Sequence, residues 1–175
     1  MAKGIILYQS KYGATKKYAL WLQESTGFDL LETKKADVNA LADYDTIVLG
    51  GGVYASGIAG LSFLKKHIGV LKGKKVATFC VGASPYDEVA FKQAYDHNFQ
   101  GEIAGLPCFY LRGAWDTQSL SFTDRTLCKM LFKALAKKDP ATYEPWEKAL
   151  MEAYEQKCDW TDRSSLDAIL EFLNN

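Results

Sequence analysis

Short apolar runs alternate along this chain with segments whose apolar residues recur at helical spacing. Five runs have the length of buried strands: one that begins at Ile5, and residues 28–33, 46–49, 76–81 and 107–111. Between several of them, apolar side chains three or four positions apart predict helices; these segments are residues 15–24, 61–71 and 91–99. Strands that alternate with helices predict right-handed crossovers and a parallel sheet covered on both faces.

The pattern changes after the fifth predicted strand. Two apolar stripes, one around Leu127 and one around Trp146, are separated by two prolines. We therefore expect residues 117–157 to form a helical insertion that precedes a last helix, with Asp162 as the cap of that helix. A chain of 175 residues is expected to fold as one α/β domain over residues 1–175.

Composition and charge narrow the class of protein. Hydrophobic residues make up 48% of the chain, so a full core can form without metal ions or disulfide bonds. The four cysteines are far apart and include no close pair typical of a zinc or redox site. A formal net charge of zero argues against nucleic acid as a partner. Because no signal peptide opens the chain and no apolar run could span a bilayer, the expected location is the cytoplasm.

The loop after the first predicted strand carries the groups that an anion needs. Ser10 and Thr15 offer hydroxyls, Lys11 offers a positive charge, and Gly13 allows close approach of the backbone. A helix predicted to start at Thr15 would point its free amides and the positive end of its dipole at the same corner. The loop therefore suits a phosphate. A tight turn capped by Thr15 accounts for these residues equally well.

Two further loops that follow predicted strands are rich in small residues. Residues 50–57 include Tyr54, and residues 82–87 include Tyr86. Ligands of open α/β sheets bind at the carboxyl ends of the strands, so aromatic loops beside a phosphate loop favour a flat, ring-containing phosphoester. Packing against the core is the competing explanation for Tyr54, and it is the favoured one for Tyr86 and Trp115. The three glycines at 50–52 are expected to close the third strand.

These loops resemble those of the flavodoxin family. Residues 10–15 (SKYGAT) resemble its FMN-phosphate loop, and residues 50–57 (GGGVYASG) and 79–85 (FCVGASP) resemble its two flavin-ring loops. Tyr12 stands where flavodoxins often have a threonine. Residues 111–116 (LRGAWD), followed by FTDR and WTD further along, resemble the branch that contains menaquinone-dependent protoporphyrinogen oxidase.

The resemblance implies a flavodoxin-like three-layer sandwich whose five parallel strands run in the order 2-1-3-4-5. It implies a non-covalently bound FMN, electron transfer through that flavin, and a redox partner protein or a quinone as the partner. No catalytic acid or base and no metal ligand are expected. The residues implied to bind the cofactor are Ser10, Lys11, Tyr12, Gly13, Ala14, Thr15, Gly52, Val53, Tyr54, Ala55, Val81, Gly82, Ala83, Ser84, Tyr86 and Trp115.

Two alternatives to a simple electron carrier stay open. One is a quinone-dependent flavin oxidoreductase of the protoporphyrinogen oxidase type, in which the insertion at residues 117–157 shapes a substrate pocket. The other is a flavin-free interaction domain, because a fold does not by itself determine a function.

Overall fold

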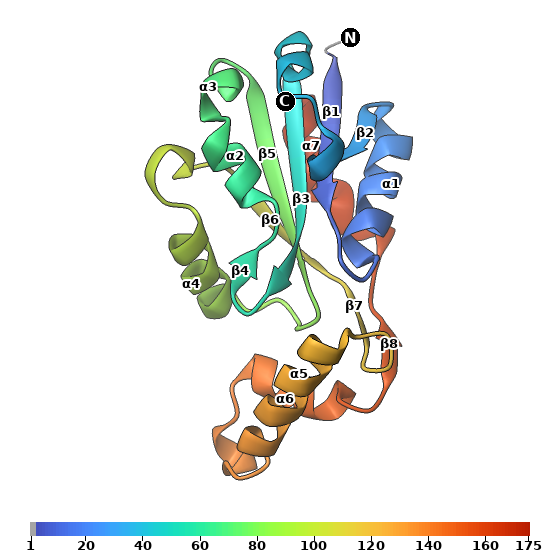
Figure 1. Ribbon diagram of the computed structural model, residues 1–175, viewed down its shortest axis with the longest axis vertical. Helices are drawn as coiled ribbons and strands as arrows, with labels where there is room; N and C mark the ends of the chain where they lie inside the picture. Colours follow the sequence, from blue (N-terminus) through green and yellow to red (C-terminus); the bar gives the residue numbers. More distant parts are fainter. Residues whose placement is uncertain (1–2) are drawn as a thin grey trace.

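The structure is a computed structural model that describes residues 3–175, and its centre is a parallel sheet (Figure 1). The five strands of this sheet lie in the order β2-β1-β3-β5-β6, which confirms the predicted order of the five predicted strands. A short strand, β4, pairs antiparallel with the end of β3. The strands are β1 (Gly4–Gln9), β2 (Asp29–Glu32), β3 (Thr46–Tyr54), β4 (Gly57–Ile58), β5 (Lys75–Gly82) and β6 (Cys108–Arg112).

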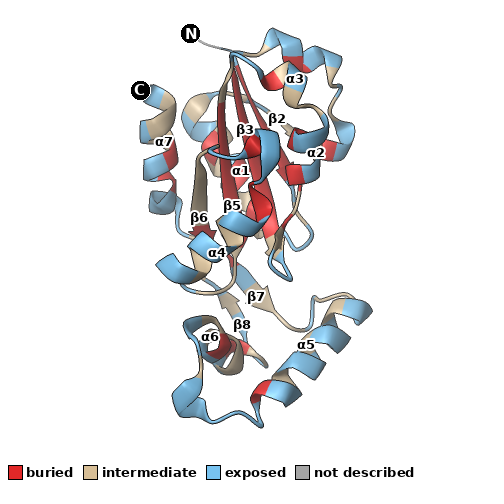
Figure 2. Ribbon diagram, turned by 90° about the vertical axis from the view of Figure 1, so that its left-hand side faces the viewer, coloured by how far each residue is buried: buried red, intermediate tan, exposed pale blue. Residues whose placement is uncertain are grey.

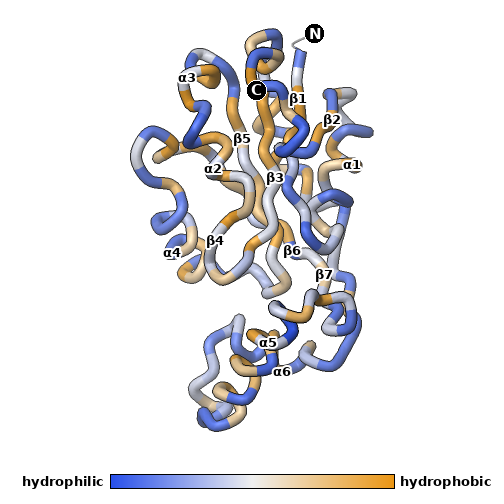
Figure 3. Tube along the Cα trace, viewed as in Figure 1, coloured by the Kyte–Doolittle hydropathy of each residue, from blue (hydrophilic) through white to orange (hydrophobic). Residues whose placement is uncertain are grey.

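Helices cover both faces of the sheet and complete three layers. One face packs against α1 (Ala14–Thr26) and α7 (Asp167–Asn174), and the other lies under α2 (Leu61–Lys66), α3 (Ile68–Leu71) and α4 (Glu88–Asn98). Alternate residues of each central strand enter opposite cores, as the period of two requires: Ile6 packs with the α1 side and Leu7 with the α2 side. The central strands β1, β3 and β5 are accordingly the most buried part of the sheet, and their apolar residues stand out along the chain (Figures 2 and 3).

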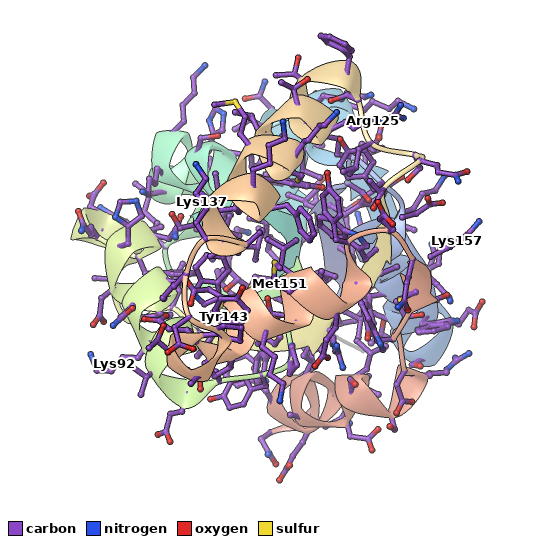
Figure 4. All side chains as sticks on the ribbon, turned by 90° about the horizontal axis from the view of Figure 1, so that it is seen from below. Lys92, Arg125, Lys137, Tyr143, Met151 and Lys157 are labelled. Carbon is purple, nitrogen blue, oxygen red and sulfur yellow. The ribbon has the colours of Figure 1, made fainter. Side chains whose placement is uncertain are left out.

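The helices predicted between residues 117 and 157 form a separate layer beyond the carboxyl ends of the strands. We call residues 117–156 the inserted lobe; it contains α5 (Phe122–Leu135) and α6 (Pro145–Ala153). Its two ends are joined by an antiparallel pair, β7 (Ala114–Asp116) and β8 (Lys157–Asp159). Seen from below, both helices cross that end of the molecule, with Arg125 near the start of α5 and Lys137 just past its end (Figure 4).

The third strand is longer than predicted, because Gly50, Gly51 and Gly52 belong to it rather than closing it. The reason is space. A β-carbon on Gly50 would lie 2.1 Å from the Phe79 ring, and one on Gly51 would lie 1.9 Å from the carbonyl oxygen of Ala59. Glycine is therefore needed here for close packing inside a strand, a role that the sequence pattern alone does not separate from a turn.

The first helix also begins differently from the prediction. Its N-cap is Gly13, whose φ of 100° lies in the left-handed region that glycine enters freely. Thr15 lies inside the first turn, and no side chain makes a capping hydrogen bond there, so Thr15 does not cap the helix. The predicted cap at Asp162 is confirmed: its side chain accepts a hydrogen bond from the amide of Ser164 at 3.0 Å. Within residues 3–175, no helix combines the length and the apolar character needed to cross a membrane.

Candidate functional site

A cavity of about 330 Å³ lies where the carboxyl ends of β1, β3 and β5 meet the inserted lobe. Its floor is made of small residues from the three loops, and its outer wall is helix α5. Leu127 and Leu131 contribute apolar side chains to that wall. The predicted site residues that line this first cavity are Tyr12, Ala14, Thr15, Gly52, Val53, Tyr54, Ala55, Val81, Gly82, Ala83 and Trp115.

The loop of residues 10–15 is folded by its own polar groups. The amide of Gly13 donates to the Ser10 hydroxyl at 3.1 Å, and the amide of Lys11 donates to the Tyr54 hydroxyl at 3.1 Å. The amides of Tyr12, Ala14 and Thr15 have no acceptor within residues 3–175. Three donors at the start of a helix are thus available to a ligand.

The Thr15 side chain is the most informative group at this corner. Its residue is almost fully buried, and its hydroxyl has no hydrogen-bonding partner among residues 3–175. Within that range, every side-chain nitrogen or oxygen that is fully shielded from solvent has a hydrogen-bonding partner. The Thr15 hydroxyl has none, so it is not fully shielded, and we infer that it opens onto the first cavity, which Thr15 lines. A buried side chain that presents a free hydroxyl to a cavity, next to free helix amides, fits an anionic oxygen.

The loop after β3 is held in a strained turn. Ala55 and Ser56 have positive φ values of 46° and 64°, which are rare for residues other than glycine. Asn98 on α4 stabilises this turn from below: its amide nitrogen donates to the Ser56 carbonyl at 2.7 Å, and its amide oxygen accepts from Ile58 at 3.1 Å. The turn fixes Tyr54. The hydroxyl of Tyr54 accepts a hydrogen bond from the loop of residues 10–15, and its ring packs edge to face on Tyr12, with ring centres 6.2 Å apart.

The loop after β5 is held by side chains of β6. The Tyr110 hydroxyl donates to the Ser84 carbonyl at 2.6 Å, and the Arg112 guanidinium donates to the Ala83 carbonyl at 3.2 Å. Burial raises the pKa of the Tyr110 hydroxyl, which therefore stays protonated and remains a donor. The backbone that borders the first cavity is consequently fixed on this side.

Five of the predicted residues do not line the first cavity. Ser10 and Lys11 border a separate surface groove beside Glu32, and Gly13 serves as the helix cap. Ser84 and Tyr86 lie further along their loop. Ser84 faces a neighbouring cavity, whereas the Tyr86 ring is 61% exposed and packs near Phe91 and Tyr110.

Comparison with known proteins identifies the family. Residues 5–142 match the profile of the flavodoxin domain. The chain belongs to the flavodoxin family. No curated protein matches it.

Several solved structures are similar to this chain, and the first one described here shares its fold. A WrbA-like flavodoxin from Agrobacterium tumefaciens is 18% identical, with a TM-score of 0.50 over 71% of this chain and 88% of that one. Two-electron reduced flavodoxin from Megasphaera elsdenii is 24% identical, with a TM-score of 0.44 over 61% and 82% of the two chains. Oxidised flavodoxin 1 from Bacillus cereus is 13% identical, with a TM-score of 0.42 over 87% and 99%.

This member of the flavodoxin family has a second cavity, of about 560 Å³, next to the first. It lies between α4, the two loops after β3 and β5, and α6. Its walls are mainly apolar and aromatic, with Phe91, Tyr110, Trp146 and Trp160 among them. The residues that border both cavities are Val53, Ala55, Gly82, Ala83, Trp115, Cys128 and Leu131.

Two residues at the site were assigned no role from the sequence. Asn98, about 40 residues further along the chain, forms hydrogen bonds with the strained turn at Ala55 and Ser56. Asp124 on α5 accepts hydrogen bonds from both Lys11 and Tyr12. Asp124 lines the first cavity, and the hydrogen bond from Lys11 lowers its pKa, so the carboxylate is charged at neutral pH. Its position three residues after Ser121 marks it as part of a helix start, but nothing in the sequence connects that helix to the loop.

Proposed function

We propose that this protein binds FMN non-covalently in the first cavity and transfers electrons through it. The observation that carries the proposal is the free Thr15 hydroxyl beside the free amides of Tyr12, Ala14 and Thr15. Membership of the flavodoxin family supports the same cofactor. When bound, FMN supplies one-electron and two-electron redox chemistry.

The chain would hold the phosphate mainly through hydrogen bonds. Free amides at a helix start together with a hydroxyl form an anion site whose donors are fixed in advance. Ser10 supports the loop from within, because its hydroxyl accepts a hydrogen bond from the amide of Gly13. The positive end of α1 adds favourable charge at the same place.

The flavin ring would occupy the apolar part of the cavity, between the loops after β3 and β5. Gly52, Val53, Ala83 and Gly82 offer a flat floor with little side-chain bulk, and Tyr54 and Trp115 offer aromatic edges. Leu127 and Leu131 on α5 would exclude water from the opposite side. An apolar surround with few positive charges disfavours negative charge on the ring, which is how the protein would tune the flavin potentials.

Titration of the flavin-depleted protein with FMN tests this proposal. Thr15→Val keeps the shape of the side chain and removes its hydroxyl, so we expect FMN binding to weaken by about 1–3 kcal/mol, the scale of one unsatisfied charged acceptor. Binding of riboflavin, which has no phosphate, should not change. Thr126→Val is the matched control, because that hydroxyl bonds only to its own helix, at Phe122. Equal FMN affinities for wild type and Thr15→Val, or no FMN binding by the wild type, would contradict the proposal.

A second candidate is a quinone-dependent oxidoreductase of the protoporphyrinogen oxidase type. The observation that favours it is the second cavity, since a simple electron carrier does not require an apolar, aromatic chamber beside the flavin site. The resemblance of residues 111–116 to that branch points the same way, although the family match extends only to the flavodoxin domain. Turnover of the FMN-loaded protein with a soluble quinone separates this candidate from a carrier that passes electrons to a redox protein. For both candidates we propose the cytoplasm as the location.

A further inference from the structure

The first turn of α5 is attached to the loop of residues 10–15 by three polar contacts. The carboxylate of Asp124 accepts hydrogen bonds from the Lys11 ammonium and the Tyr12 hydroxyl. The amide of Ser121 donates to the Tyr12 oxygen at 3.2 Å. We call these four residues the Asp124 clasp. It connects segments that are more than 100 residues apart in the chain.

The clasp places the negative charge of the Asp124 carboxylate beside the loop of residues 10–15, whose free hydrogen-bond donors suit an anionic ligand. Lys11 is the only cation among residues 10–15, and it is engaged by Asp124. The other carboxylate that borders the first cavity, Asp116, is already bonded to the amides of Gln118 and Ser119. Asp124 is thus the carboxylate that a ligand phosphate on this loop would meet.

A phosphate held by the Thr15 hydroxyl and the free amides beside it would lie at the same corner as the Asp124 carboxylate, since Thr15 and Asp124 both line the first cavity. Like charges that share one site repel each other. The two anions should therefore compete, and their competition should be reciprocal: whatever loosens the clasp favours the phosphate, and the phosphate loosens the clasp. Cys128, one turn after Asp124 on α5, borders both cavities and would report the movement.

We propose that Asp124 is an internal competitor for the phosphate corner, so that a phosphorylated ligand displaces it and releases the start of α5, which forms part of the wall of the first cavity. This inference rests on the proposed function. It makes Asp124 a residue that sets selectivity for a phosphorylated over an unphosphorylated flavin. It also makes the inserted lobe a lid whose position depends on the cofactor.

Flavin titration of Asp124→Asn tests the selectivity. Asparagine keeps the shape of the side chain and removes its charge, so we expect FMN to bind about tenfold more tightly, from the loss of one nearby like charge, and riboflavin to bind as before. Asp96→Asn is the matched control, since it removes a carboxylate that bonds to a lysine, Lys92, on α4 and lines neither cavity. Its FMN affinity should equal that of the wild type. An unchanged or weaker FMN affinity in Asp124→Asn would overturn the competition.

Thiol labelling tests the release without any flavin. We expect inorganic phosphate to increase the rate at which N-ethylmaleimide labels Cys128 in the wild type, read by peptide mass spectrometry. In Asp124→Asn the rate should be high from the start and insensitive to phosphate. If phosphate leaves the wild-type rate unchanged, or if both proteins label alike, the lid is excluded. This result stands even if neither protein binds FMN, in which case the proposed function fails separately.

Discussion

Two clusters of buried apolar residues cover the faces of the sheet, whereas α5 and α6 of the inserted lobe contribute to neither. Inside the lobe, the buried residues are Leu135, Glu147 and Ala153. Polar contacts attach the lobe to the rest of the fold: the Asp124 clasp, and the β7–β8 pair at its base, which the ion pair between Asp159 and Lys17 joins to α1. A body held by packing is rigid, and a layer held by exposed polar contacts opens at lower free energy. The site lies between the two.

The largest effect on stability is expected where a substitution would clash with the backbone inside the sheet. Gly51→Ala would place a β-carbon 1.9 Å from the Ala59 carbonyl, which is backbone and cannot rotate away. We expect a loss of about 3 kcal/mol or more in the free energy of unfolding, at the upper end of overpacking effects. The measurement is urea unfolding followed by circular dichroism at neutral pH.

Gly69→Ala is the control for that substitution. Gly69 lies in α3, and nothing is within 4 Å of the position of its β-carbon, so alanine should leave the stability unchanged or raise it by about 0.5–1 kcal/mol. If Gly51→Ala were as stable as Gly69→Ala, the end of β3 would be adaptable, and the contrast between sheet and lobe would weaken.

The glycines at 50–52 also show where sequence reasoning reaches its limit. The strand order and the helix layers could be predicted, because local periodicity and short connections determine them. The loop of residues 10–15 could be recognised as a phosphate-binding candidate because its hydroxyls, lysine and glycine are contiguous in the chain. The extension of β3 could not be predicted. Glycine is needed at positions 50 and 51 because of the Phe79 ring and the Ala59 carbonyl, which are distant in the sequence.

The same limit applies more strongly at the site. Asn98 and Asp124 act on loops 40 or more residues away, and a single sequence contains no sign of those pairings. The helices of the lobe were predictable from their apolar stripes. Their placement over the carboxyl ends of the strands was not, because the β7–β8 pair that directs them is only three residues long on each side.

An intermediate effect is expected inside the lobe. Phe132 of α5 stacks on Tyr154 with ring centres 3.8 Å apart and an interplanar angle of 11°. Phe132→Ala should destabilise the lobe by about 1–2 kcal/mol, from the lost aromatic pair and its buried area. Amide exchange in α5 and α6 should become about tenfold faster or more, while exchange in β1, β3 and β5 stays as in the wild type.

Hydrogen exchange with mass spectrometry makes that measurement, with Lys133→Ala as the control because Lys133 is the exposed neighbour of Phe132. Faster exchange in the central strands of Phe132→Ala would mean that lobe and sheet unfold together. The comparison between a packed body and a loosely attached layer would then be wrong.

The smallest effect is expected at the ion pair between Lys17 and Asp159, which joins α1 to the end of β8 at 2.8 Å. The hydrogen bond from Lys17, with two more from Thr161, lowers the pKa of Asp159 from 3.8 to about 2. A carboxyl with a depressed pKa stabilises the fold above its unfolded value, near pH 4, and loses that contribution as the pH falls through about 2. Both side chains are well exposed, at 42% and 57%, so solvent screening keeps the contribution small.

We expect Asp159→Asn to lower the melting temperature by about 2 °C at pH 7, with the difference from the wild type vanishing between pH 4 and pH 2. Carboxyl groups common to both proteins cancel in that difference, so a gap that persists unchanged at pH 2 would assign the effect to packing at β8 rather than to charge.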